Sequence, residues 1–302
     1  MPKAFISTCI LLALATGCSR QEGTPPKKVT YETTVVIGLI PEKQIFDQVD
    51  RYTPLAAYIS RKTGILIKLN VLSRYGNIID NFVSSGMDGA FFGSFTYTLA
   101  HAKLGVEVLA RPENLEGRST YHGLIFVKKD SGIKNAADMK GKRFAFVDKA
   151  TTAGYLLPLD YFSRNGIKDY KSHLKEAYFA GTHEDAIYDV LNGKADIGTA
   201  KNTIYEHVAG TDSRIIKELM VLEKSPEVPE NGLAVRQDLD ASVKKRLKET
   251  LLTMHDDPEG RSVLKDFGAR RFIETTDKDY EPVIRYVRTI GLDLSKYDYV
   301  NE

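Results

Sequence analysis

The sequence predicts an α/β protein made of two lobes, with a hinge and an interlobe cleft. Short apolar runs of the strand type alternate with amphipathic helical patterns, which is typical of βαβ units and a largely parallel sheet. The alternation restarts at Gly123. Beyond the N-terminal segment about 270 residues remain, more than a single hydrophobic core comfortably serves.

The first series opens with a buried-strand run at 34–40 and a helical pattern at 52–62. Pro54 suits the first turn of this helix, and Gly64 suits its end. The strand and helix patterns that follow lie, in alternation, at 65–72, 77–85, 89–93, 94–104 and 106–110.

A second series of patterns starts at Gly123. Its strands and helices are expected at 123–128, 143–147, 152–164, 178–180, 183–191, 196–200, 202–208 and 219–222, followed by a strand at 233–236. From Asp240 onward the pattern is helical, with apolar residues at helical spacing.

Two places suit the passage of the chain between lobes. Gly123 starts the second series, and Pro226 and Pro229 bracket an extended turn. We therefore expect one lobe from residues 34–122 plus 232–302 and the other from residues 123–231. Two crossings make a hinge, and clefts of this kind are where small ligands bind.

The N-terminus has the pattern of a secretory signal peptide over residues 1–17. Lys3 is followed by an apolar run and then by small residues. The run is shorter than the roughly 20 residues that span a bilayer. The Ala-Thr-Gly-Cys ending resembles the lipobox of bacterial lipoproteins, although Ala15 stands where leucine is usual. The resemblance implies cleavage before Cys18 and lipidation of that cysteine; the alternative is an ordinary signal with an incidental cysteine.

Residues 18–33 are polar, contain two adjacent prolines and are interpreted as a tether. We therefore expect a protein of the periplasm or cell exterior, held at the membrane by its lipid. The chain has only two cysteines, and Cys9 leaves with the signal. This excludes an internal disulfide and a cysteine zinc site, and neither a metal nor a cofactor is expected.

The charge distribution argues against nucleic acid as a partner. The chain has 42 basic and 40 acidic residues, a formal net charge of +2. Its longest basic run is Lys244-Lys245-Arg246, which lies in a helical pattern and is interpreted as a solvated helix face.

Several segments, in order, carry a family pattern: Ile40-Pro41-Glu42, Tyr52-Thr53-Pro54-Leu55, Thr63-Gly64, 92–97, 148–155, 181–186 and 193–198. Together they resemble the periplasmic phosphate/phosphite/phosphonate-binding proteins of ABC importers. The resemblance covers most of the mature chain. It implies a type II-like periplasmic-binding-protein fold, a small phosphorus oxyanion bound between the lobes, and an ABC permease as partner.

Two segments with hydroxyl side chains lie at expected strand-to-helix junctions. Thr151, Thr152 and Ala153 precede Gly154, which allows close backbone approach. In the other lobe the corresponding segment is Ser94, Phe95, Thr96 and Tyr97. A helix start offers free N–H groups and a partial positive charge, so two facing starts would hold one anion without arginine. The alternative is that Ser94, Thr151 or Thr152 only caps a helix.

Four further residues are candidate ligand contacts. His183 would donate to the ligand, with Thr182 as the helix cap, or else be structural. By the resemblance, Asp196 would accept from a protonated oxyanion or pair with a ligand amine; capping or a surface role is the alternative. Phe92 and Tyr52 would line the cleft or pack in the core. Ser94 and Ala153 depart from the family, which has a proline and a third hydroxyl there, so a weaker site or another ligand stays open.

An enzyme is not expected. The chain has no zinc-ligand spacing, no Walker loop and no nucleophile elbow, and its six histidines are scattered. We expect a monomeric, lipid-anchored solute-binding protein of an ABC importer that binds phosphonate, phosphite or phosphate. The alternatives are a ligand sensor feeding a membrane kinase and a binding protein for a different small anion.

Overall fold

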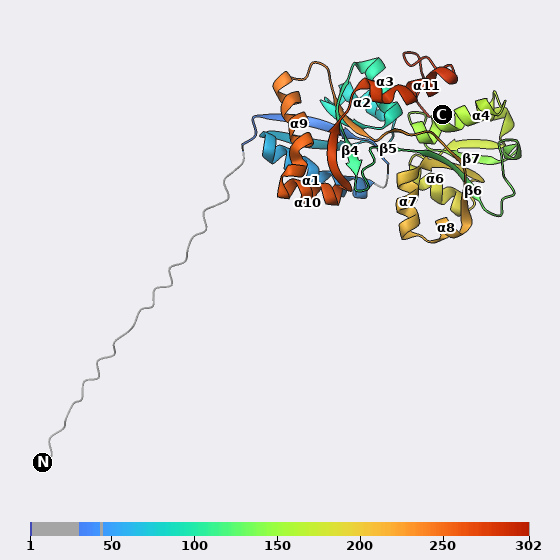
Figure 1. The fold of residues 1–302 in the computed structure, drawn as a ribbon, viewed down its shortest axis with the longest axis horizontal. Helices are drawn as coiled ribbons and strands as arrows, with labels where there is room; N and C mark the ends of the chain where they lie inside the picture. Colours follow the sequence, from blue (N-terminus) through green and yellow to red (C-terminus); the bar gives the residue numbers. More distant parts are fainter. Residues whose placement is uncertain (2–29, 43–44, 302) are drawn as a thin grey trace. The chain divides into compact units, whose positions relative to one another are not determined.

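A computed structural model describes Met1, residues 30–42 and residues 45–301. Residues 2–17 of the predicted signal peptide, the predicted lipidation site Cys18 and residues 19–29 of the predicted tether lie outside these described residues. From Tyr31 onward the described chain forms two main sheets, each covered by its own helices (Figure 1).

The first sheet has the strand order β13-β4-β12-β3-β1-β2. Its strands are β1 (Thr33–Leu39), β2 (Ile65–Val71), β3 (Gly89–Phe92), β4 (Glu107–Asn114), β12 (Gly232–Val235) and β13 (Ala269–Glu274). Successive side chains of a strand point to opposite faces. Val35 and Ile37 therefore join one apolar cluster, while Val36 packs against another.

Helices cover both faces of this sheet. One face packs against α1 (Ile45–Thr63), α9 (Ala241–Thr253) and α10 (Pro258–Phe267), the last two joined by the 3-10 turn η3 (Met254–Asp256). The other face packs against α2 (Asn77–Ser84), α3 (Ser94–Leu104) and α11 (Glu281–Thr289), which the 3-10 turn η4 (Asp277–Tyr280) precedes.

The second sheet has the order β10-β6-β9-β7-β8. Its strands are β6 (Gly123–Lys128), β7 (Arg143–Phe146), β8 (Glu176–Phe179), β9 (Ile197–Lys201) and β10 (Leu219–Lys224). Its helical segments are η1 (Ala137–Met139), the π-helical turn η2 (Thr152–Leu156), α4 (Leu157–Arg164), α5 (Tyr170–His173), α6 (His183–Leu191), α7 (Asn202–Thr211) and α8 (Arg214–Glu218).

Three chain segments connect the two sheets. The short strands β5 (Thr120–Tyr121) and β11 (Val228–Pro229) pair antiparallel where the chain passes from one sheet to the other and back. The C-terminal tail makes the third connection. The Tyr297 hydroxyl donates to the Lys149 carbonyl at 2.9 Å, and Asn301 Nδ2 donates to Asp148 at 2.8 Å.

The α/β class and most of the expected elements are confirmed, but the prediction of largely parallel sheets is wrong. Strands β1, β2 and β3 pair parallel, whereas β12 pairs antiparallel to both of its neighbours. In the second sheet β6 likewise pairs antiparallel with β9 and β10. These antiparallel strands directly follow the connecting segments, so the chain re-enters each sheet in the reverse direction.

Helix α1 and the C-terminal region differ most from the predicted elements. Helix α1 begins at Ile45 rather than at residue 52, so Pro54 lies inside it. Proline leaves the carbonyl four residues earlier without its helical partner; here this carbonyl belongs to the exposed Asp50, where water can bond it. The C-terminal region is not helical throughout, because β13 interrupts it and pairs with β4, burying Ala269 and Phe272.

Candidate ligand-binding site

The two predicted strand-to-helix junctions face each other. Helix α3 starts at Ser94 directly after β3, and the turn η2 starts at Thr152 in the other lobe. The Phe95 N–H donates to Thr152 Oγ1 at 3.0 Å, and Thr96 Oγ1 donates to the Ala150 carbonyl at 3.1 Å. A backbone N–H at the start of α3 and hydroxyls from both lobes are thus brought to one place.

The alternative that these hydroxyls cap the helices is wrong for both junctions. Gly93 is the N-cap of α3, and the Ser94 hydroxyl instead donates to the Pro229 carbonyl at 2.7 Å. Thr151 precedes η2, but its hydroxyl donates to the Asp148 carbonyl at 2.7 Å. Capping does occur at α6, where Thr182 accepts from the Asp185 N–H at 2.9 Å, as predicted.

A small cavity, here called the inner cavity, lies between these junctions. It has a volume of about 10 Å³, which is roughly the space of one water molecule. Its lining is mostly polar and comes from both lobes: Ile40, Glu42, Tyr75, Gly93, Ser94, Thr96, Tyr121, Thr151, Thr152, His183, Lys201 and Asn231. A phosphorus atom with its oxygens is several times larger, so it enters only when the lobes part or side chains move.

Two buried polar groups of this lining have no hydrogen-bond partner among the described residues. They are the Tyr75 hydroxyl, on a residue that is 2% exposed, and Asn231 Nδ2, on a residue that is 5% exposed. A buried polar group without a partner costs about 1–3 kcal/mol. Two such groups in one cavity therefore favour a ligand that accepts hydrogen bonds.

His183 supplies a third donor to the inner cavity. Its Nδ1 accepts from the Lys201 N–H at 3.3 Å, so the ring hydrogen lies on Nε2. Burial lowers the pKa of His183 to about 3, and the ring is therefore neutral at physiological pH. A neutral imidazole in this state offers one N–H to a ligand.

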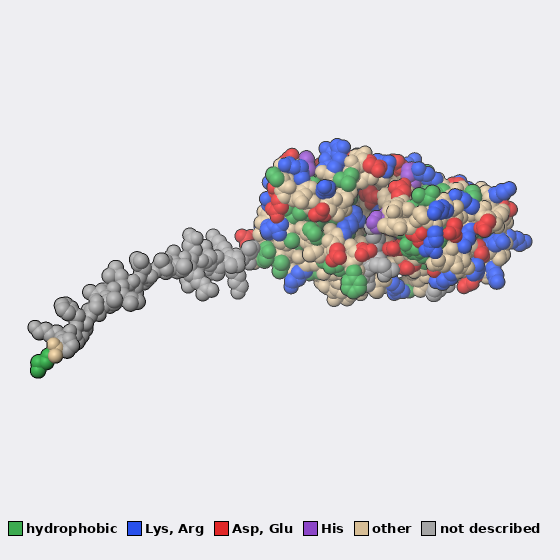
Figure 2. Space-filling model, turned by 90° about the horizontal axis from the view of Figure 1, so that it is seen from below, with side chains coloured by type: hydrophobic (Ala, Val, Ile, Leu, Met, Phe, Trp, Pro, Cys, Tyr) green, Lys and Arg blue, Asp and Glu red, His purple; other side chains and the backbone are tan. Residues whose placement is uncertain are grey.

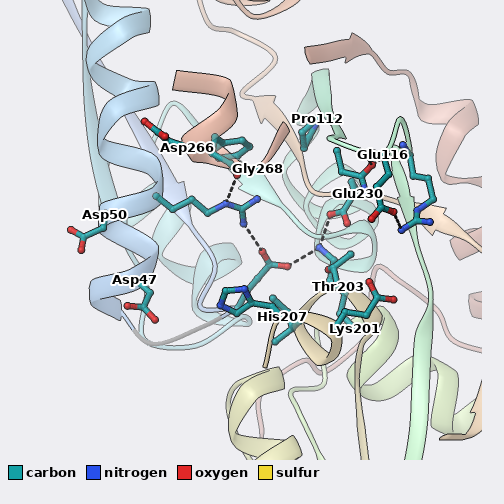
Figure 3. Close-up of a pocket in the computed structure, with 17 residues that line it drawn as sticks. Asp47, Asp50, Pro112, Glu116, Lys201, Thr203, His207, Glu230, Asp266 and Gly268 are labelled. Atoms are coloured by element: carbon teal, nitrogen blue, oxygen red, sulfur yellow. Dashed lines mark hydrogen bonds and ion pairs between the residues drawn. The ribbon is translucent and has the colours of Figure 1, made fainter. Parts of the chain in front are cut away.

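Glu42 and Lys201 form the boundary between the inner cavity and a second, larger one. This outer cavity has a volume of about 740 Å³. Lys201 Nζ donates to Glu42 at 2.9 Å and to Glu230 at 2.6 Å. In Figure 3 the side chains of Lys201 and Glu230 point toward each other across this boundary, and Asp47 and Asp50 stand on α1.

Glu42 and Lys201 are both ionised at neutral pH. Burial alone would raise the pKa of Glu42, but Lys201 and Arg51 outweigh it and lower the pKa to about 2. Burial likewise opposes the charge on Lys201, yet Glu230 and Glu42 raise its pKa above the ordinary value. Arg51 Nη1 lies 3.9 Å from Glu42, so two cations face two carboxylates.

Several predicted site residues lie outside the lining of the inner cavity. Asp196 pairs with Arg143 at 2.9 Å, each side chain about one third exposed. The Tyr97 hydroxyl donates to Asp277. Tyr52 packs against Phe91, with ring centroids 5.0 Å apart. These side chains therefore have structural partners away from the two junctions.

Three more predicted contacts lie in the core beside the cavity. Phe92 packs against Phe82 at 6.2 Å between centroids, and the Phe95 ring packs against Tyr297 at 5.6 Å. Ala153 is buried, with its carbonyl accepting from Thr199. A Cβ on the neighbouring Gly154 would lie 2.4 Å from Val147, so that glycine is required by packing.

Five further polar side chains line the inner cavity but were not predicted from the sequence as ligand contacts: Tyr75, Tyr121, Glu42, Lys201 and Asn231. Lys201 had a usable signal, because it stands between a strand and a helix like the two junctions that were identified. In open α/β sheets, ligands bind at the carboxyl ends of parallel strands. Asn231 had no such signal, since it enters from a connecting segment.

Comparison with known proteins decides the family. Residues 37–280 match the family described as ABC transporter, phosphonate, periplasmic substrate-binding protein. The chain belongs to this family. It is 25% identical over 265 residues to the phosphonates-binding periplasmic protein of Escherichia coli K12, covering 86% of this chain and 78% of that protein.

Two further relatives are similar. The phosphate-import protein PhnD of Mycolicibacterium smegmatis is 28% identical over 217 residues, covering 67% of this chain and 66% of that protein. The binding-protein component of a Pseudomonas aeruginosa ABC phosphonate transporter superposes with a TM-score of 0.79 at 24% identity, covering 86% and 87% of the two chains. The expected two-lobed periplasmic-binding-protein fold is thereby confirmed.

Family membership also settles the class of function. The family consists of substrate-binding components of transporters, so the protein is a transport protein and not an enzyme.

In the described part of the chain no helix is long and apolar enough to cross a bilayer, and no three His, Cys, Asp or Glu residues are placed to hold a metal. On the face drawn in Figure 2, basic and acidic side chains are interspersed.

Proposed function

We propose that this protein is the lipid-anchored binding component of an ABC importer and that it holds a small phosphorus oxyanion in the inner cavity. The observation that carries the proposal is the pair of buried donors without acceptors, Tyr75 and Asn231, in a cavity that also has hydroxyls from both lobes. An oxyanion is the ligand that satisfies many donors at once.

Polar side chains surround the cavity from both sides. Ser94 and Thr96 come from the start of α3, Thr151 and Thr152 from the start of η2, and His183 from the start of α6. The Ser94, Thr96 and Thr151 hydroxyls donate to backbone carbonyls, so they serve the ligand only by turning away from these carbonyls. Helix α3 also directs free N–H groups toward the cavity. Among the described residues no arginine lines it, so the anion is held by neutral donors with Lys201 as the nearby cation.

The same contacts explain how a ligand would join the lobes. The Phe95 N–H now donates to Thr152 across the cleft at 3.0 Å. An oxyanion between the two junctions would accept from Phe95 and from the Thr152 hydroxyl together. Ligand binding then shifts the population toward the closed form because only this form offers both sets of donors.

Isothermal calorimetry with the purified protein tests the proposal. Phosphate, phosphite, methylphosphonate and 2-aminoethylphosphonate are titrated separately, with sulfate as the control anion. We expect micromolar or tighter binding of at least one phosphorus oxyanion. The absence of binding to all four at millimolar ligand would overturn the proposal. The relatives named for phosphonates and for phosphate support the ligand class.

We also propose that Cys18 carries the lipid and holds the protein at the membrane on the periplasmic or outer side, beside its permease. Support comes from the small residues before Cys18 and the polar segment after it. Membrane fractionation of cells that express the full chain tests this. The unaltered chain is expected in the membrane fraction and the Cys18→Ser variant outside it. Equal membrane retention of both would refute the anchor.

A further inference from the structure

The boundary between the inner and outer cavities is built around one ammonium group. Lys201 is 3% exposed, and its Nζ contacts Glu42, Glu230 and Asn231 at 2.9, 2.6 and 3.4 Å. The same atom lies 4.6 Å from the centre of the Tyr121 ring. These contacts pair Lys201 with Glu42, which lines both cavities, and with Glu230, which lines the outer cavity.

The position of Lys201 bears on the part of a ligand that does not enter the donor cluster. Glu42 and Lys201 line both cavities, so a substituent leading from the inner to the outer cavity must pass them. A cationic substituent would meet the Lys201 ammonium and would find Glu42 and Glu230 already paired. Like charges placed together in a buried site repel each other strongly.

The outer cavity by itself would attract a cation. Beyond the boundary two arginines, Arg51 and Arg118, are outnumbered in its lining by acidic side chains, which are Asp47, Asp50, Glu116, Glu206 and Asp266. Lys201 therefore separates a cavity of hydrogen-bond donors from a cavity that suits an ammonium group.

We propose that Lys201 determines specificity by occupying the position of a ligand ammonium, so that the inner cavity selects phosphorus oxyanions with a small uncharged substituent and rejects aminoalkylphosphonates. This inference rests on the proposed function, because it assumes that the phosphorus group lies in the inner cavity.

Ethylphosphonate and 2-aminoethylphosphonate provide the test, since they share a two-carbon chain and differ by one ammonium. Calorimetry on the unaltered protein is expected to show ethylphosphonate binding at least about tenfold more tightly. In Lys201→Ala, Glu42 and Glu230 lose their shared ammonium and can accept that of the ligand, so the preference is expected to invert. Lys244→Ala is the matched control, because Lys244 pairs with Glu107 at 2.7 Å and lines neither cavity.

The outcomes separate the two proposals. If neither compound, nor phosphate, phosphite or methylphosphonate, binds to the unaltered protein, the proposed function fails. If 2-aminoethylphosphonate binds the unaltered protein as tightly as ethylphosphonate, the inference about Lys201 is wrong while the function stands. This comparison needs no variant, so it decides the question even if Lys201→Ala does not fold. An unchanged preference in a folded Lys201→Ala would also overturn the inference.

Discussion

Replacing Lys201 by methionine should destabilise the protein strongly, because it leaves two buried carboxylates without their shared partner. The side chains of Lys201 and Glu42 are each 4% exposed. Glu42 has its pKa lowered from 4.5 to about 2, and at about 1.4 kcal/mol per unit this amounts to about 3 kcal/mol. Removing one partner of a buried ion pair independently gives about 3–5 kcal/mol.

The loss should depend on pH in a defined direction. In the unaltered protein the Glu42 contribution is complete above pH 4.5 and disappears as the pH falls through about 2. Without Lys201, burial dominates and raises the pKa of Glu42. The variant is then least stable at neutral pH and regains stability as the pH falls and the carboxyl is protonated. The difference in the free energy of unfolding between the unaltered protein and the variant should therefore become smaller from pH 7 toward pH 5.

Urea unfolding followed by circular dichroism measures both effects, and thermal melts should show a decrease of about 6–12 °C at neutral pH. Lys244→Met is the matched control. Lys244 pairs with Glu107, whose side chain is 44% exposed, and such a pair contributes about 1 kcal/mol at most. Equal losses of stability in the two variants would refute the reasoning. So would a stability difference between the unaltered protein and Lys201→Met that does not change with pH.

Three other predictions follow from the contacts of Thr152, Asp196 and Asp148. Thr152→Ala should weaken binding of the phosphorus oxyanion about tenfold through loss of a charge-assisted donor; unchanged affinity in calorimetry would leave Thr152 as an interlobe contact only. Asp196→Asn should leave affinity within about twofold, since the carboxylate pairs with a partly exposed arginine; a tenfold loss would restore Asp196 to the site. Burial raises the pKa of Asp148 from 3.8 to about 6, so its stabilising contribution is complete below pH 3.8 and lost as the pH rises through about 6. Asp148→Asn should make the free energy of unfolding in urea less dependent on pH across that range, and an unchanged pH dependence would contradict this.

The sequence predicted local elements well where periodicity and end signals agree. Helix α3 follows a buried strand and ends at Gly105, which adopts φ 68°, and its bounds match the prediction. Strand β13 was not predicted, for the opposite reason. It is stabilised by pairing with β4, more than 150 residues earlier in the chain, and local periodicity does not contain that pairing. The antiparallel direction of β12 depends on the same kind of long-range information.

The candidate site likewise contains residues that the local sequence predicts and residues that only the fold brings together. Hydroxyls at strand-to-helix junctions could be found from the sequence, because both the chemistry and the local geometry are encoded in adjacent residues. The interlobe pairing of Lys201 with Glu42 joins residues 159 positions apart. A lysine and a glutamate at such separation are ordinary surface residues until the fold buries them. Asp196 was favoured by its motif, yet the fold turns it toward Arg143 instead.

The Lys201–Glu42 bond also affects how closure responds to a ligand. It connects β9 of the second sheet to the segment after β1 of the first, and Phe95 and Thr152 make a second connection nearby. Part of the closed form is therefore stabilised by the protein itself. At the proposed site an oxyanion would replace the Phe95–Thr152 bond with its own and leave the ion pair in place. The ion pair is present with or without ligand. The free energy that the ligand adds to closure is then the free energy of its own hydrogen bonds minus that of the Phe95–Thr152 bond that it displaces.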